Sequence, residues 1–270
     1  MKNTAHSRFG TYALAIVNCL ICLFLLAPIL VVIVTSFSAD QYMRFPPSGW
    51  SLRWYTAFVE DDNLMNGLLL SAVLAVTTAV ISGAIGTLAA FSLTRSETKT
   101  KEVLRLLHTA PLITPGVVVG LSMLIFFTTI GLRGSFLTLL FGHVVLSIPF
   151  VVIIVMSGLQ SYDRSLEDAA QSLGANKFIA FTTITIPVIK TSAISAAAFA
   201  FLHSFDEVIV TLLLPGPRTK TLPVTMFEYI QYNLDPLPAA VSTVLIALTV
   251  LLVFSGVKLG VIKRLMHEKN

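Results

Sequence analysis

The chain has 270 residues, of which 55% are hydrophobic and only 12% are charged, and its mean hydropathy is +0.85. Soluble domains carry about 25% charged residues, so most of the surface of this chain cannot face water. Its formal charge of +4 is spread in short stretches between apolar runs, which argues against the clustered basic face of a nucleic-acid-binding protein. We therefore expect an integral membrane protein that is surrounded by lipid and has no nucleic-acid partner.

Six apolar segments are long enough to cross a bilayer, for which about 20 residues are needed. The first follows Lys2 and Arg8 as in a signal peptide, but it is too long for a signal peptide's apolar region and is expected to remain as an uncleaved helix. Within it, Cys19 and Cys22 have C-x-x-C spacing without a second pair for zinc, so we interpret them as apolar filler. The expected spans are residues 12–34, 68–93, 113–130, 136–156, 192–214 and 239–259.

Two prolines stand at the start of the third expected span. Pro111 and Pro115 are expected to break a helix that begins near Lys101, because proline lacks the backbone donor that a helix needs. Within a membrane, such an interruption is tolerated only where protein or water satisfies the freed carbonyl groups. The pattern therefore indicates a helix packed inside a bundle.

The basic residues predict the orientation of the chain. With the N-terminus inside, thirteen Lys and Arg residues fall in inner segments and five in outer loops. Cytoplasmic segments are enriched in Lys and Arg, so both termini are expected in the cytoplasm. The longest inner loop is then residues 158–191, and the five outer basic residues are Arg44, Arg53, Arg133, Arg218 and Lys220.

The first half of loop 158–191 has the composition of a short helix. Ser165 is expected to cap it, with Glu167 and Asp168 in the first turn, where the helix dipole favours acidic groups. Gly174 stands where helices commonly end in a left-handed residue.

The second half of the loop, residues 176–186, also has a helical composition, and Pro187 is expected to separate it from the fifth span. On the first helix, four side chains share one face because they follow the i, i+3, i+4, i+7 spacing. Such a face suits docking into a groove of another protein. The alternative is an ordinary interfacial hairpin that seats the bundle. The four residues are Leu166, Ala169, Ala170 and Leu173.

The same loop carries a spaced motif. Residues 168–170 are Asp-Ala-Ala, Gly174 follows after three residues, and nine residues later comes Ile-x-Ile-Pro at 184–187. This closely resembles the EAA loop of ATP-binding-cassette importer permeases, in which Glu-Ala-Ala, Gly and Ile-x-Leu-Pro have the same spacing. Asp168 stands where Glu is usual and Ile186 where Leu is usual, which preserves the acidic charge and the apolar bulk.

The resemblance implies a role for this loop. In that family it forms a coupling helix, which sits in a cleft of a separate ATPase subunit and moves when the ATPase dimer closes. By analogy, residues 168–170 form the docking face, Gly174 makes the turn, and Ile184 and Pro187 hold the loop against the bundle. The implied coupling-loop residues are Glu167, Asp168, Ala169, Ala170, Gly174, Ile184 and Pro187.

The resemblance also implies an architecture and partners. The fold class is an all-α, six-helix membrane bundle of the type I importer permease kind, in a bacterial inner membrane. One domain would cover residues 1–270, with a peripheral first helix at 12–34, a core bundle at about 65–262 and the coupling loop at 158–191. The implied partners are an ATPase dimer, a second homologous permease, identical or different, and an extracytoplasmic solute-binding protein.

No catalytic or metal site is expected on this chain. It has no Gly-x-x-x-x-Gly-Lys-Ser/Thr phosphate loop, so ATP would be bound and hydrolysed by a separate polypeptide. The chain would therefore be a non-catalytic subunit without a cofactor of its own.

Further segments resemble the spermidine/putrescine permease subgroup, which implies polyamine import. An amino-acid-like compound or another small solute is the alternative. The segments are Ser-Phe-Asp-Glu-Val-Ile-Val at 204–210, Thr-Leu-Pro-Val at 221–224, Asp-Pro at 235–236 and Ala-Ala-Val-Ser-Thr at 239–243.

Two carboxylates are candidates for the solute pathway. Asp206 and Glu207 are expected inside the fifth span, where an ionisable group costs at least about 2.5 kcal/mol and therefore faces a cavity or a partner. Consecutive helical residues point about 100° apart, so at most one of the two would face the pathway. The alternative is that Asp206 pairs with His203, or with an Arg of a partner subunit, only to hold the bundle. His108 and His143, each alone among apolar residues, are interpreted as core histidines.

The outer loop 216–237 offers further candidates. Glu228, Tyr229, Tyr232 and Asp235 combine carboxylates with aromatic faces, which suits an alkylammonium group through cation–π contact. We expect these residues to lie near the acidic pair.

Three other classes of protein would show different sequence features. An ion-coupled secondary transporter would show an internal repeat and several intramembrane ionisable residues. A membrane hydrolase would show paired metal ligands or a nucleophile with its base. An assembly or receptor subunit would not need the coupling loop.

Overall fold

The computed structural model describes residues 4–95, 101–132, 134–161, 163–214, 216 and 219–267. Five of the basic residues that entered the orientation count, Lys2, Lys99, Arg133, Arg218 and Lys269, lie outside these ranges. The orientation of the termini therefore stays a prediction.

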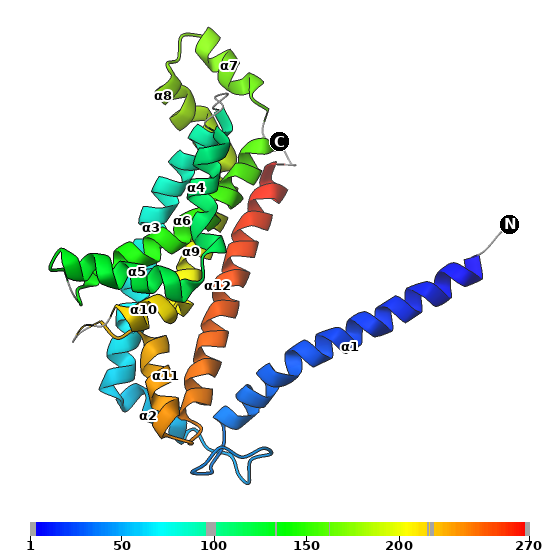
Figure 1. Ribbon diagram of the computed structural model, residues 1–270. Helices are drawn as coiled ribbons and strands as arrows, with labels where there is room; N and C mark the ends of the chain where they lie inside the picture. Colours follow the sequence, from blue (N-terminus) through cyan, green and yellow to red (C-terminus); the bar gives the residue numbers. More distant parts are fainter. Residues whose placement is uncertain are drawn as a thin grey trace. The chain divides into compact units, whose positions relative to one another are not determined.

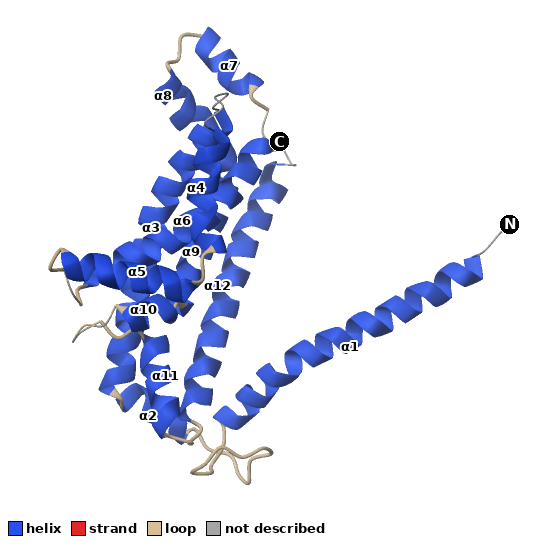
Figure 2. Cartoon of the chain, viewed as in Figure 1, coloured by secondary structure: helices blue, strands red, loops and turns tan. Residues whose placement is uncertain are grey.

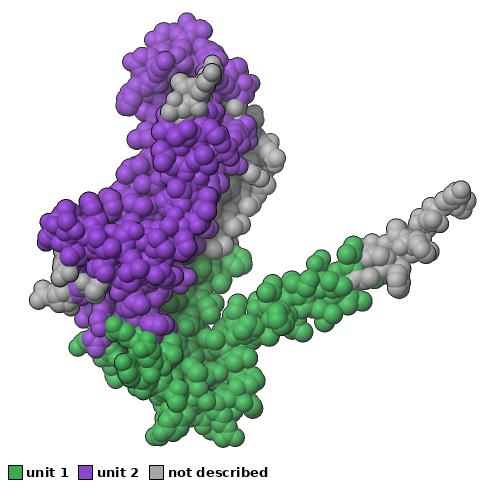
Figure 3. All heavy atoms as spheres, viewed as in Figure 1, with its two compact units in different colours: residues 1–62, 228–270 green, residues 63–227 purple. Residues whose placement is uncertain are grey.

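Helices account for most of the described residues, and no strand occurs among them beyond an isolated bridge between Ser38 and Trp50 (Figure 2). The chain divides into two compact units (Figure 3). Unit 1 comprises Met1–Asp62 and Glu228–Asn270, and unit 2 comprises Asn63–Phe227. The helices (Figure 1) are α1 Thr4–Ser36, α2 Arg53–Glu60, α3 Asp62–Arg95, α4 Lys101–Ile113, α5 Gly116–Thr129, α6 Phe136–Gln160, α7 Ser165–Ser172, α8 Lys177–Ala180, the π-helix η1 Phe181–Thr185, α9 Ile186–Asp206, α10 Ile209–Leu213, α11 Leu222–Tyr232 and α12 Leu237–His267.

Length and apolar composition give four or five candidate membrane-spanning helices within the described part of the chain. Four helical stretches are long and apolar enough to span a membrane, and α4 with α5 makes a fifth if this pair, bent by 101°, is one span. Helix α12 has a shorter apolar stretch, Leu237–Leu251. The integral membrane class is therefore confirmed, whereas the count of six stays a prediction. The four stretches are Leu14–Ser36, Asp62–Arg95, Phe136–Gln160 and Lys177–Asp206.

The break expected near the third span lies at Pro115 and not at Pro111. Helix α4 continues through Pro111 to Ile113, and Pro115 stands at the N-terminal boundary of α5 with φ −55° and ψ 132°. A proline pushes the residue before it out of the helical region, which ends α4 before Pro115. Pro111 costs α4 one backbone hydrogen bond without ending it.

The fifth span is not the continuous helix that was expected over residues 192–214. Helix α9 ends at Asp206, Glu207 is extended with ψ 116°, and the short α10 begins at Ile209. The apolar run continues past Asp206, so hydropathy alone does not reveal that the backbone leaves the helical conformation there.

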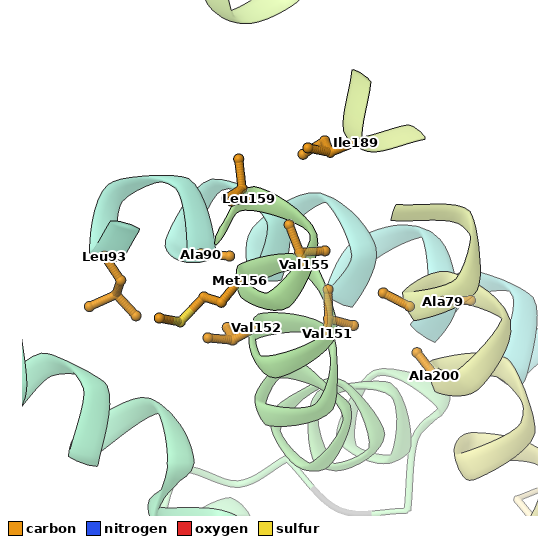
Figure 4. Close-up of a cluster of buried hydrophobic side chains, with 11 residues drawn as sticks. Ala79, Ala90, Leu93, Val151, Val152, Val155, Met156, Leu159, Ile189 and Ala200 are labelled. Atoms are coloured by element: carbon orange, nitrogen blue, oxygen red, sulfur yellow. The ribbon is translucent and has the colours of Figure 1, made fainter. Parts of the chain in front are cut away.

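The core of unit 2 forms where α3, α6 and α9 pack together (Figure 4). Its side chains are mostly small or β-branched, so the helices approach closely, as is common in membrane bundles. At Gly86 on α3, an added Cβ would lie 2.6 Å from Val151 Cγ1 on α6, so only glycine fits this contact. The cluster is Ala79, Ala90, Leu93, Val151, Val152, Val155, Met156, Leu159, Ile189, Ala196 and Ala200.

In unit 1, α2 and α12 pack together and the loop before α2 is held by polar contacts. Asp40 Oδ2 accepts hydrogen bonds from Ser48 N at 2.9 Å and from Ser38 Oγ at 3.1 Å. The most apolar part of α1 has no buried residue, and the expectation that this helix is peripheral to the bundle stays a prediction.

Candidate functional site

Helix α7 opens the loop that carries the spaced motif, and Ser165 is its first residue rather than its cap. The N-cap position is Arg164, which makes no side-chain cap bond, and Asp163 Oδ1 accepts a hydrogen bond from Ser165 N at 2.9 Å, so the predicted cap at Ser165 is wrong. The backbone N–H and the side chain of Ser165 hold the pKa of the Asp163 carboxyl below its ordinary value. The acidic residues Glu167 and Asp168 do lie in the first turn, as predicted.

The end of α7 has the predicted glycine geometry. Gly174 has φ +94°, a conformation that side chains with a Cβ rarely adopt. Gly174 N donates to Gln171 O and Ala175 N donates to Ala170 O, each at 3.0 Å. This is the Schellman pattern, which satisfies two carbonyl groups that the end of a helix would leave without a partner.

The second half of the loop joins the next span without the break predicted at Pro187. Asn176 Oδ1 caps α8 by accepting from Ile179 N at 2.8 Å, and helical backbone then runs from Lys177 to Asp206. The π-helical turn η1 ends at Thr185, two residues before the proline, with Ile186 N bonded to Phe181 O. Proline normally clashes with the carbonyl four residues earlier, and a wider π-turn relieves this clash.

The hairpin of α7 and α8 lies at one end of unit 2 (Figure 1) and exposes apolar side chains. Leu166 on α7 is 50% exposed, Leu173 at the C-terminal cap of α7 is 90% exposed, and Phe178 on α8 is 73% exposed. Asp168 and Ala169 are also exposed, Ala170 and Ile184 are partly buried, and Pro187 is exposed. Three large apolar side chains exposed on one short hairpin are consistent with an interaction site.

Glu167 faces the interior, in contrast to its neighbours on α7. It is only 6% exposed, and its two carboxylate oxygens accept from Nε and Nη2 of Arg95 at the end of α3. Glu167 Oε1 also accepts from the Thr185 hydroxyl of η1 at 2.8 Å. Sequence reasoning used Arg95 only to orient the chain and did not single out Thr185, because no local pattern links residues so far apart in the sequence.

The two carboxylates at the α9–α10 break have different environments. Glu207 Oε1 accepts from Val210 N at 2.9 Å, so Glu207 caps α10. The Asp206 side chain is exposed and accepts no hydrogen bond within the part of the chain that the structure describes. The expectation that both lie inside one continuous helix is therefore wrong, because the backbone breaks between them.

Three buried polar groups bridge this break. His143 on α6 is fully buried, and its Nδ1 and Nε2 are hydrogen-bonded to the hydroxyls of Ser204 on α9 and Thr211 on α10, at 2.8 and 2.9 Å. The interpretation of His143 as a core histidine is thus confirmed. No hydrogen bond or ion pair joins Asp206 to His203 among the described residues, where His203 Nδ1 is buried without a hydrogen-bond partner, although both carboxylates are close enough to interact with the ring electrostatically.

The outer-loop candidates belong to unit 1, whereas the acidic pair belongs to unit 2. Tyr229 Oη donates to Asp235 Oδ2 at 2.6 Å, and Asp235 Oδ1 accepts from Leu237 N at 3.0 Å at the start of α12. Burial, followed by the bond to Asp235, raises the pKa of Tyr229 above its ordinary value. Tyr232 is 84% exposed, and Glu228 is partly buried. That these residues gather near Asp206 stays a prediction.

The fold and this loop define a helical membrane protein with a structured hairpin between two of its spans. Residues 82–265 match the family described as binding-protein-dependent transport system inner membrane component, and the chain belongs to this family.

Two relatives have similar sequences over most of their length. The chain is 32% identical over 231 residues to the putrescine transport system permease protein PotI of Escherichia coli K12, covering 83% of this chain and 82% of that protein. It is 28% identical over 233 residues to the spermidine/putrescine transport system permease protein PotC of the same strain, covering 86% and 88%.

Among solved structures, a bacterial ABC transporter involved in the import of the acidic polysaccharide alginate has a chain with a similar fold. The TM-score is 0.73 at 16% identity, covering 96% of this chain and 98% of that chain. At this identity the likeness demonstrates the fold alone. It agrees with the expected importer-permease architecture.

Proposed function

We propose that the chain is the membrane permease subunit of an ATP-driven importer and forms half of the pathway for a small solute. The observation that carries the proposal is the hairpin of α7 and α8, whose apolar side chains are exposed while Glu167 anchors it to the bundle. Membership of the transport family supports the same role. The chain moves a solute and leaves ATP hydrolysis to another polypeptide.

The exposed face of α7 is the proposed docking surface for the ATPase. Leu166 and Leu173 supply apolar area, and Asp168 and Ala169 lie exposed beside them. An amphipathic helix recognises a groove through side chains three and four residues apart, which is the spacing of this face. Gly174 ends the helix, and Ile184 and Pro187 belong to the continuous helical stretch that joins the hairpin to the membrane.

The remaining partners follow from this role. An ATPase dimer would bind ATP, a second homologous permease would complete the pathway, and both termini would lie in the cytoplasm. A chain with a similar fold, with a TM-score of 0.71 at 14% identity, comes from an alginate transporter in complex with a pentasaccharide-bound periplasmic protein. That complex supports a soluble solute-binding protein as the partner on the outer side.

The proposed solute is a polyamine. The names of two relatives, a putrescine permease and a spermidine/putrescine permease, support this assignment. Asp206 adds a physical reason, because an exposed carboxylate at a helix break attracts an ammonium group. Glu228, Tyr229 and Tyr232 are proposed as further contacts on the pathway.

A second candidate solute also has support. The chain is 28% identical to a putative 2-aminoethylphosphonate transport system permease protein, PhnV, of Salmonella paratyphi A, covering 88% of this chain and 89% of that protein. Competition of labelled putrescine uptake by unlabelled spermidine and by 2-aminoethylphosphonate distinguishes the two solutes.

The experiment that tests the role is co-purification with an ATPase, combined with uptake of labelled putrescine. We expect Ala169→Arg to abolish both while membrane insertion persists, because a long cation cannot enter a groove shaped for alanine. Gln171→Arg, at an exposed position of the same helix outside the motif, is the matched control. Uptake that continues in the Ala169→Arg variant at the control rate would reject the docking surface.

A further inference from the structure

The starting observation is the attachment of α7. Glu167 is the one buried side chain of this eight-residue helix, all of which is described. The docking face proposed above lies on exposed residues of the same helix. Any force applied to that face therefore reaches the rest of unit 2 through few contacts, and Glu167 makes the buried polar ones.

The contacts of Glu167 reach two other elements. Both carboxylate oxygens bind the Arg95 guanidinium at the end of α3, and one of them also accepts from Thr185 in η1. The side chains of Arg95 and Glu167 are 16% and 7% exposed. Charge-assisted bidentate hydrogen bonds are restricted to a narrow range of geometry. The Arg95–Glu167 pair therefore resists a movement of α7 relative to α3 more strongly than apolar packing would.

Aromatic contacts reinforce the same connection. The Arg95 guanidinium lies 5.6 Å from the centre of the Phe91 ring, one turn earlier on α3. The Phe91 ring in turn lies 4.6 Å, between centroids, from the ring of Phe181 in η1. Helix α3 and the π-helical turn are thus joined twice, once through Glu167 and once through the two phenylalanines.

The π-helical turn η1, which Thr185 links to Glu167, leads directly into the fifth span. It precedes Pro187 in the helical stretch that continues into the fifth span, and π-turns are frequent at functional sites. A displacement of α7 that is passed to Thr185 therefore acts directly on the start of α9, and one passed to Arg95 acts on the end of α3.

We propose that Arg95, Glu167 and Thr185 form a polar strut that passes the displacement of α7 to α3 and α9. Glu167 is then a positioning residue for coupling and not a contact of the docking surface. This inference rests on the proposed function, since it requires that an ATPase moves α7. It adds that ATPase binding and solute movement depend on different residues of one short helix.

The test uses the complete transporter, with partner permease, ATPase and solute-binding protein, in proteoliposomes supplied with labelled putrescine. Three quantities are measured: ATPase co-purification, the rate of ATP hydrolysis, and putrescine uptake per ATP hydrolysed. For Glu167→Gln we expect unchanged co-purification and retained hydrolysis, because the substituted group does not face the ATPase. We expect uptake per ATP to fall about tenfold, since a buried bond to a charged group is weakened.

A double variant separates coupling from simple loss of structure. Arg95→Gln together with Glu167→Gln replaces the ion pair by two amides that can still hydrogen-bond, and we expect it to recover part of the uptake per ATP that each single variant loses. Glu102→Gln removes a carboxylate from an exposed position of α4 and is the matched control, expected to behave as the wild type. Thr185→Val, which removes one hydroxyl, replaces Glu167→Gln if that variant does not insert.

The possible outcomes are distinct. Uptake per ATP that stays at the wild-type value in Glu167→Gln and Thr185→Val overturns the strut. Loss of ATPase co-purification in Glu167→Gln also overturns it, because Glu167 would then belong to the docking surface. Failure of the wild-type chain to bind any ATPase would reject the proposed function itself, and the strut with it.

Discussion

Two regions of unit 2 carry a pair of adjacent carboxylates, and in both the members of the pair have opposite environments. In α7, Glu167 is buried against Arg95 whereas Asp168 is exposed. At the α9–α10 break, Glu207 caps the next helix whereas Asp206 is exposed. In α7, consecutive helical residues point about 100° apart, so the helix directs one carboxylate inward and its neighbour outward, whereas the second pair is separated by the break in the backbone after Asp206.

Two adjacent carboxylates in a membrane protein therefore do not necessarily bind the same partner or solute. In each region one carboxylate maintains the structure and the other remains available to a partner or a solute. The regions differ in how the inner carboxylate is satisfied. Glu167 has a cation 72 residues away in the sequence, while Glu207 uses a backbone N–H three residues along the chain.

The largest expected effect follows from removing the inner carboxylate of α7. Glu167→Ala removes the carboxylate that pairs with the largely buried Arg95 cation, and breaking a buried ion pair in this way destabilises a protein by about 3–5 kcal/mol. We expect a lower thermal unfolding midpoint in detergent for Glu167→Ala and a near-normal one for Asp168→Ala. Equal midpoints for the two variants would contradict the division of roles in this pair.

The second effect concerns the bridge across the α9–α10 break. His143→Leu leaves the buried hydroxyls of Ser204 and Thr211 without their bonds to His143, at a cost of about 1–3 kcal/mol for each group that finds no other partner. The measurement is amide hydrogen exchange, which should accelerate in α10 more than in α3. The triple variant that also carries Ser204→Ala and Thr211→Val should recover stability, and no recovery would argue against the bridge.

The third effect compares the two carboxylates of the break directly. Glu207→Ala removes the cap of α10, which is worth about 0.5–2 kcal/mol, and should lower stability with little change in the KM for putrescine. Asp206→Asn should raise that KM and leave stability unchanged, because its side chain is exposed. A raised KM in Glu207→Ala with a normal KM in Asp206→Asn would reverse the assignment.

The smallest effect is a pH dependence at the start of α7. The Asp163 carboxylate is stabilised by Ser165, so its pKa is lowered in the folded protein. A lowered pKa contributes stability that is present above the ordinary aspartate value and is lost as the pH falls through the lowered value. Amides of the first turn of α7 should therefore exchange faster in acid, and Asp163→Asn should remove that dependence. A dependence that persists in the variant would have another origin.

Some features of the site could be predicted from local sequence. The left-handed conformation of Gly174 was expected because glycine carries no Cβ, and its neighbours complete the bonds that end α7. The break near Pro115 was expected for a similar reason, since proline constrains the residue before it. Both predictions depend on the conformational preferences of a few consecutive residues, and these preferences can be inferred from the sequence alone.

Other features could not be predicted because their causes are distant or concealed. The helix runs through Pro187 because a π-turn precedes it, and no composition marks a π-turn. The end of α9 at Asp206 falls within an apolar run, and His143, which is hydrogen-bonded to Ser204 and Thr211 on either side of the break, lies on another helix. The cap was misplaced at Ser165 because Asp163 and Ser165 both carry side chains that can accept from the first turn, and only the backbone path decides that Asp163 does so.

Sequence by itself determined that this protein lies in a membrane and carries a structured, motif-bearing loop between two spans, because hydropathy, helix-ending glycine and motif spacing are local properties. Tertiary structure alone decided that Glu167 faces inward and Asp168 outward, and that Glu207 is a cap while Asp206 is exposed. The physical reason is that a buried carboxylate requires a partner, and Arg95 reaches Glu167 only when α3 and α7 meet in the folded chain.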